Sequence, residues 1–186
     1  MSELARNTTI VLVLLIVSVA TGAWSTMADP AVGEEILTVL KDSIMGEVLD
    51  SSSLMMAITL FLNNLQACLL MFLGGASFGL LTVFIISTNG LIIGSVLEMV
   101  RQEHSLMYVA AAIVPHGLFE IPAFLISGAL GLMLARALWF EWEKGEDAAA
   151  RAQALGRTFV LAVVPLVAIA AGVEAFITPE ILRLII

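Results

Sequence analysis

The sequence predicts an all-α membrane protein that crosses the bilayer about five times. Of its 186 residues, 60% are hydrophobic and 13% are charged, and the mean hydropathy is +1.05. Soluble domains are about 45–50% apolar, so lipid must surround much of this chain. Between Leu54 and Val100 the only charged residue is Glu98. At about 1.5 Å per residue, this stretch is too long for one crossing of a core about 30 Å thick.

We expect membrane spans at residues 8–27, 54–75, 77–99, 105–135 and 157–177 of a single domain, 1–186. The first apolar run exceeds the length typical of a signal peptide, so we expect it to be retained. An alternative division starts the second span near Asn63, ends it near Ser87 and draws "RQEH" (101–104) into the membrane. That division buries Arg101 and Glu103 at high cost, so a surface turn is preferred.

Two polar segments set the expected orientation. Residues 29–53 are acidic with apolar residues at helical spacing, which predicts an amphipathic helix on the outer membrane surface. Residues 136–157 carry four basic residues and Trp139 and Trp142, which predicts a polar cytoplasmic linker beside an aromatic belt. We therefore expect a multi-pass protein of the cell membrane, with its N-terminus in the cytoplasm and its C-terminus outside.

Composition also excludes several function classes. The net charge of −8 leaves no basic stripe for nucleic acid. The single cysteine, Cys68, excludes an intrachain disulfide, and no glycine-rich loop with Lys-Ser or Lys-Thr predicts a nucleotide. No HExxH or other complete catalytic or metal-binding motif is present, so we expect neither an enzyme nor a resident cofactor.

Polar residues are predicted to gather near the bilayer midplane. His116 and Glu120 are four residues apart and share one helix face. Asn89 and His116 lie twelve residues before and after the ends of "RQEH", about 18 Å of helix in each case. Glu174 falls nearer the outer end of the last span, where an interfacial role is expected. The predicted polar cluster comprises His116, Glu120, Asn89, Asn64 and Asn63.

The same stretches contain residues that interrupt helices. Pro115 and Pro122 cannot donate a backbone hydrogen bond, while Gly90 and Gly117 permit irregular backbone. We therefore expect broken helices near Asn89–Gly90 and at Pro115–Gly117. A break inside a membrane requires protein or a wet cavity around it.

Two pieces of the sequence resemble the stage II sporulation protein M family. They are "NNLQACLLMFLGGASFGLLTVFIISTNGLIIGS" and "IVPHGLFEIPAFLISGALGL", which together cover roughly residues 60–135. Gln66 stands where such proteins often carry a basic residue. The resemblance implies an integral membrane protein, and its sporulation member looks like a membrane scaffold for cell-wall hydrolases. Many members occur in organisms that do not sporulate, so that specific role is not transferred.

Two functions are expected from these features. The first is a membrane scaffold or assembly protein whose polar cluster hydrogen-bonds internally and stabilises the bundle. The second is a small ion-coupled or solute permease that uses the cluster as its site. An intramembrane enzyme is a distant third. The expected partners are membrane lipids, a second copy in a dimer, and other membrane proteins.

Overall fold

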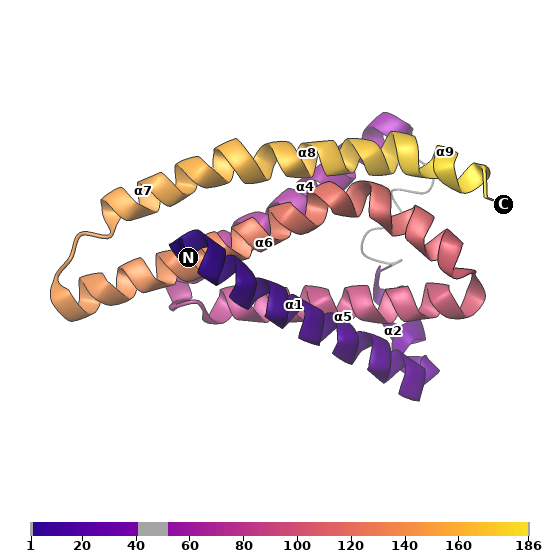
Figure 1. The fold of residues 1–186 in the computed structure, drawn as a ribbon, viewed down its shortest axis with the longest axis horizontal. Helices are drawn as coiled ribbons and strands as arrows, with labels where there is room; N and C mark the ends of the chain where they lie inside the picture. Colours follow the sequence, from indigo (N-terminus) through magenta and orange to yellow (C-terminus); the bar gives the residue numbers. More distant parts are fainter. Residues whose placement is uncertain (1, 41–51, 186) are drawn as a thin grey trace.

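The computed structural model describes residues 2–40 and 52–185, and within these ranges the chain is almost entirely helical. Figure 1 shows long helices that run back and forth, with the chain ends toward opposite ends of the bundle. In order, the elements are α1 (Glu3–Ala28), α2 (Pro30–Leu40), α4 (Ser53–Leu73), η2 (Gly74–Ser77), α5 (Leu80–Glu103), α6 (Leu106–Lys144), α7 (Ala149–Thr158), η3 (Phe159–Val163), α8 (Val164–Gly172), η4 (Val173–Ile177) and α9 (Thr178–Arg183).

The prediction of five spans is confirmed. Helices long and apolar enough to cross a membrane run over Glu3–Ala28, Ser53–Ser77, Leu80–Glu103, Leu106–Lys144 and Ala149–Arg183. The preferred division of the second and third spans also holds, because the chain turns at residues 74–79 and again at His104 and Ser105. The Glu98 carboxylate has its hydrogen-bond partner on the same helix, because Arg101 donates two hydrogen bonds of 2.7 Å to it.

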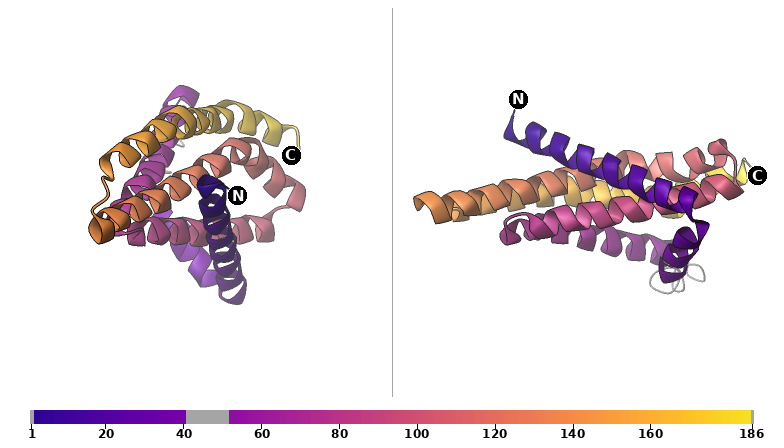
Figure 2. Two further views of the ribbon diagram at one scale, coloured as in Figure 1. Left: turned by 60° about the vertical axis from the view of Figure 1, so that its left-hand side comes forward. Right: turned by 90° about the horizontal axis from the view of Figure 1, so that it is seen from below.

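Helix α6 lies at the centre of the bundle and contacts α1, α4, α5 and α8. The core that it shares with its neighbours contains Met71, Ile86 and Leu130, whose side chains are fully buried. Polar side chains also join the helices: Ser127 donates to the Cys68 carbonyl and Thr82 to the Met71 carbonyl. Figure 2 shows the long helices packed against one another, with α1 crossing the others at an angle.

The predicted break near Asn89–Gly90 is wrong, because α5 is a continuous helix there. A Cβ at Gly90 would come within 2.5 Å of the Ser18 Cβ on α1. A Cβ at Gly94 would collide with the Val19 carbonyl oxygen. These glycines therefore permit close contact between α1 and α5, as small residues do in membrane helix pairs.

The predicted break at Pro115–Gly117 is also wrong, since α6 stays helical from Leu106 to Lys144 with Pro115 and Pro122 inside it. The helix bends instead, and Figure 1 shows α6 changing direction in its first half. Proline removes one backbone hydrogen bond and crowds the carbonyl four residues earlier, which kinks a helix without necessarily ending it. Gly117 has ordinary contacts at its Cβ position, the nearest at 3.7 Å.

The last span accommodates its prolines differently. The π-helical turns η3 and η4 end two residues before Pro165 and Pro179. The Val164 and Thr178 amides donate to carbonyls five residues back, at Phe159 and Val173. Each wider turn contains the carbonyl that the proline would otherwise crowd, so the last span stays helical past both prolines.

The two predicted polar segments are only partly as expected. Residues 30–40 form helix α2, which contacts α1 and α5, while residues 41–51 lie outside the described residues. The segment 136–157 is mostly helical rather than a linker, because α6 extends to Lys144 and α7 begins at Ala149. Gly145, with φ of 69°, ends α6 in the left-handed conformation that glycine adopts most readily.

Charged residues join the helices at the end of the bundle that holds the α6–α7 connection, which we call the basic end. Glu3 on α1 forms ion pairs with Arg136 on α6, at 3.4 Å, and with Arg151 on α7, at 2.6 Å. These three residues line a hollow of about 360 Å³. The basic end also carries Arg6, Lys144 and Arg157, so five of the eight basic residues of the chain lie there.

Candidate functional site

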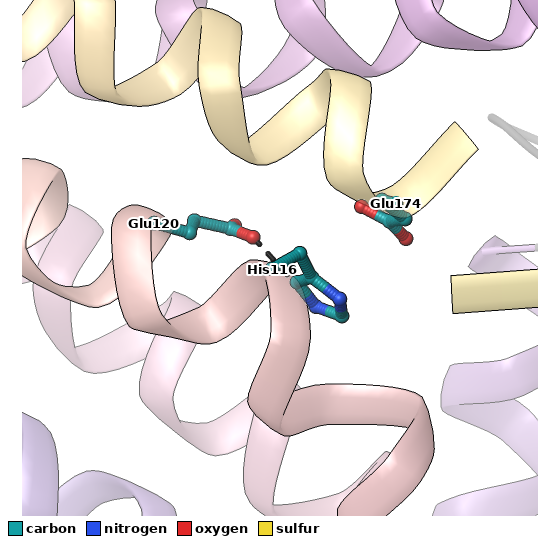
Figure 3. A group of neighbouring side chains, drawn as sticks. All are labelled: His116, Glu120 and Glu174. Atoms are coloured by element: carbon teal, nitrogen blue, oxygen red, sulfur yellow. Dashed lines mark ion pairs between the residues drawn. The ribbon is translucent and has the colours of Figure 1, made fainter. Parts of the chain in front are cut away.

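Three ionisable side chains from two spans converge at the bend of α6. His116 and Glu120 lie on α6, and Glu174 extends toward them from η4 in the last span, as Figure 3 shows. One candidate ligand atom from each of these side chains lies within 4.8 Å of those of the other two. We call these three residues the His–Glu–Glu cluster.

Local backbone features place all three groups. Pro115 directly precedes His116 and Pro122 follows Glu120 by two residues, so the pair occupies the proline-containing part of α6. Figure 3 shows the ribbon of α6 turning at His116. Glu174 belongs to the π-helical turn η4, a rare element that often occurs at functional sites. The two groups of residues meet because η4 packs against α6.

The imidazole of His116 lacks hydrogen-bond partners among the described residues. Its Nδ1 atom is buried without a partner, and its Nε2 atom lies 3.9 Å from Glu120 Oε2, beyond hydrogen-bond range. A buried polar atom without a partner costs about 1–3 kcal/mol. The ring is therefore positioned for a proton or a ligand that the protein itself does not provide.

The charges in the cluster do not balance. It contains two carboxyl groups and a single imidazole, and within the described residues neither Glu120 nor Glu174 pairs with a lysine or arginine. Like charges this close repel strongly in a low-dielectric interior. A proton or a bound cation must offset this repulsion, which gives the cluster the electrostatics of a cation site.

The cluster lies about midway along the expected membrane depth and is partly exposed. His116 lies ten residues after the start of α6, and Glu174 lies nine residues before the end of α9, about 15 Å of helix in each case. This is roughly half of a bilayer core. The exposed fractions of the His116 and Glu120 side chains are 16% and 29%, so both are partly exposed at the surface of the bundle.

The structure joins His116 with Glu120 as predicted but does not bring the asparagines to them. Asn89 is half-buried and donates to the Ile85 carbonyl on its own helix at 2.9 Å. Asn64 is half-buried and Asn63 exposed on α4, and neither has a side-chain hydrogen bond in the described part of the chain. Glu174, which was expected at the membrane interface, lies beside His116 and Glu120 in place of the asparagines. The sequence feature that could have indicated it is a lone carboxylate in an apolar span, five residues before Pro179.

Comparison with known proteins identifies the family. A family model described as stage II sporulation protein M matches residues 11–179, which include all five spans in whole or large part. An uncharacterised protein of Methanocaldococcus jannaschii is 30% identical over 122 residues, covering 64% of this chain and 68% of the relative. No solved structure matches the chain. The chain, a multi-pass membrane protein with five candidate spans, therefore belongs to the stage II sporulation protein M family.

Proposed function

We propose that this protein binds and releases a cation, a proton or a metal ion, inside the membrane, as a small ion-coupled permease does. The observation that carries the proposal is the position of Glu174 beside His116 and Glu120. A cluster that only stabilised the bundle would pair one acid with one base or hydrogen-bond every polar atom. This cluster has a second carboxyl group and a buried Nδ1 atom that has no partner among residues 2–40 and 52–185.

The surroundings of the cluster support the same function. Ionisable groups in membrane spans are costly, and they commonly mark ion pathways and proton relays. The two sides of the site belong to α6 and the last span, each of which contains prolines. Small shifts of a bent helix against a π-helical turn would change the distances among three ligand atoms. The site can therefore bind an ion in one arrangement and release it in another.

Reconstitution into liposomes tests this proposal. Vesicles that contain the protein and an internal pH-sensitive dye are given an inward proton gradient or a gradient of a metal ion, and the flux is recorded. We expect flux above that of empty vesicles, and a loss of most of it in Glu120→Gln and Glu174→Gln. The control is Glu180→Gln. Glu180 lies six residues after Glu174 in the last span, and it is exposed and paired with Arg183. Flux equal to that of empty vesicles for both ions would refute the proposal.

A scaffold or assembly function is the second candidate, and a different surface favours it. Asn63 and Gln66 lie three residues apart on the exposed side of α4, near the middle of its 21 residues. Neither side chain has a hydrogen-bond partner in the described residues. Amide side chains facing lipid are costly, and they commonly join one membrane helix to another. We therefore propose α4 as the surface through which the protein assembles.

A further inference from the structure

We propose that the cation held by the His–Glu–Glu cluster is a divalent transition-metal ion of the Zn²⁺ class. The ligands are one imidazole nitrogen of His116 and one carboxylate oxygen from each of Glu120 and Glu174. This inference rests on the proposed function, because it names the cation that the cluster takes.

The donor set determines the class of ion. Ca²⁺ and Mg²⁺ are bound by oxygen ligands, six or more for Ca²⁺ and six for Mg²⁺, and do not favour imidazole. Imidazole suits zinc, copper, iron and nickel, and catalytic zinc sites and non-haem iron sites combine histidine with carboxylate ligands, usually two histidines with one carboxylate. A site of one nitrogen and two oxygens therefore selects a transition metal over the alkaline-earth ions.

The distances in the cluster suit such an ion after a contraction of the site. The three ligand atoms lie within 4.8 Å of one another, so at the largest spacing an ion equidistant from all three would be about 2.8 Å from each. Zinc binds nitrogen and oxygen at about 2.0–2.2 Å, which places tetrahedral ligands about 3.4 Å from one another. Rotations about the side-chain bonds of Glu120 and Glu174 can close the difference, and they leave the helices in place.

A second observation points to a ligand independently of the acidic groups. The Nδ1 atom of His116 is buried and has no hydrogen-bond partner in the part of the chain that the structure describes. A metal ion bound to Nδ1 or Nε2 of His116 gives one of these two unpartnered nitrogens a ligand bond, and its charge also offsets the two carboxylates. A simple helix-to-helix ion pair would do neither.

Three protein ligands leave a fourth position open. Structural zinc sites are closed by four protein ligands, whereas sites that exchange a ligand keep one position for water. Cys68, the single cysteine of the chain, is buried on α4, and its sulfur is outside the group of close ligand atoms. The site is thus suited to a metal ion that is bound and released rather than held permanently.

Metal titration of the full-length protein tests the inference directly. The purified protein, in detergent micelles and free of any histidine tag, is stripped with a chelator and titrated with Co²⁺ while visible absorption is recorded. Competition with Zn²⁺ then gives its affinity. We expect one site per chain, displaced by Zn²⁺ but not by millimolar Ca²⁺ or Mg²⁺. His116→Ala, Glu120→Gln and Glu174→Gln should each weaken binding at least about tenfold, because even outer-shell changes cost that much.

Matched controls are available within the chain. His104 is the only other histidine, and it is exposed and stacks on Tyr108. His104→Ala and Glu180→Gln should leave the affinity unchanged. The inference is wrong if wild type binds no Co²⁺, or if the cluster variants bind as wild type does. Thermal unfolding with and without Zn²⁺ guards against a misfolded variant, since wild type should gain stability from the ion and folded cluster variants should not.

The outcome separates this inference from the proposed function. Stoichiometric metal binding at the cluster without flux in liposomes would uphold the site and refute the permease. Proton flux that depends on Glu120 and Glu174, without metal binding, would uphold the permease and refute the metal.

Discussion

At the scale of single residues, glycines and prolines in a span can have the same sequence signature for opposite reasons. Gly90 follows Asn89, which suggested a helix break, yet its role is to admit Ser18 of the neighbouring helix. That role depends on which helix lies opposite, and a single sequence does not contain that information. His116 and Glu120 were predictable as a pair because their spacing is local, whereas the approach of Glu174 from a distant span was not.

Packing against backbone makes Gly94 sensitive to substitution. A Cβ there would collide with the Val19 carbonyl, which cannot rotate away as a flexible side chain could. Gly94→Ala should therefore lower the free energy of unfolding by about 1–3 kcal/mol, as overpacking does. Gly156→Ala is the control, because outside its own helical turn no atom of the described residues lies within 4 Å of a Cβ at that position, and it should be neutral or slightly stabilising. Thermal unfolding in micelles measures both, and equal midpoints for the two variants would contradict the close contact.

At the scale of elements, the four prolines of α6 and the last span show two solutions to one problem. In α6, Pro115 and Pro122 are accommodated inside one continuous, bent helix. In the last span, Pro165 and Pro179 each follow a π-helical turn. Sequence rules locate the missing hydrogen bond but do not choose between a break, a bend and a wider turn. Neighbouring helices decide this, and here the choice sets the direction of His116 and Glu174.

The role of the π-helical turn η4 can be tested with a substitution that leaves the three ligand residues of the cluster unchanged. Pro179→Ala restores the amide that the Ala175 carbonyl lacks, so we expect the turn to tighten into an α-helix and to rotate Glu174 relative to α9. Metal affinity should fall about tenfold, as it does when groups that orient a ligand are changed. Pro165→Ala, at the other π-helical turn, is the control and should keep the affinity of wild type. Equal affinities in the two variants would show that η4 does not position the site.

At the scale of the whole molecule, the number of spans and the turns that separate the second, third and fourth were predictable. The continuation of the fourth span to Lys144, the start of the fifth at Ala149, and the surfaces between the spans were not. Apolar length and the isolated turns at 74–79 and 104–105 fix the spans, because lipid imposes a length on each crossing. The distribution of small residues does not reveal a dimer, because glycines such as Gly75 and Gly131 pack against backbone within one chain. Evidence for a second copy must come from polar groups that remain exposed.

Orientation in the membrane follows from charge and is open to a direct test. Because five of the eight basic residues lie at the basic end, we propose that this end faces the cytoplasm. Helix α2 is at the opposite end, so Glu35→Cys in a Cys68→Ala background should react with an impermeant thiol reagent from outside intact cells. Ala154→Cys, exposed on α7, should react only after the membrane is opened. The reverse pattern would invert the proposed topology.

The exposed amides of α4 predict how two copies associate. Asn63 lies about 15 Å along α4, near the bilayer midplane, where water is not available to its side chain. Pairing with the same residue of a second copy would satisfy both amides, and such hydrogen bonds contribute about 0.6–1.7 kcal/mol in membranes. Asn63→Leu should therefore raise the dimer dissociation constant about three- to twenty-fold, measured by single-molecule subunit counting at a series of dilutions in lipid bilayers. Asn89→Leu is the matched control, since Asn89 already donates to its own helix and its loss should leave the dimer intact. If wild type is monomeric at every dilution, or if Asn63→Leu associates as tightly as Asn89→Leu, α4 is not the dimer surface.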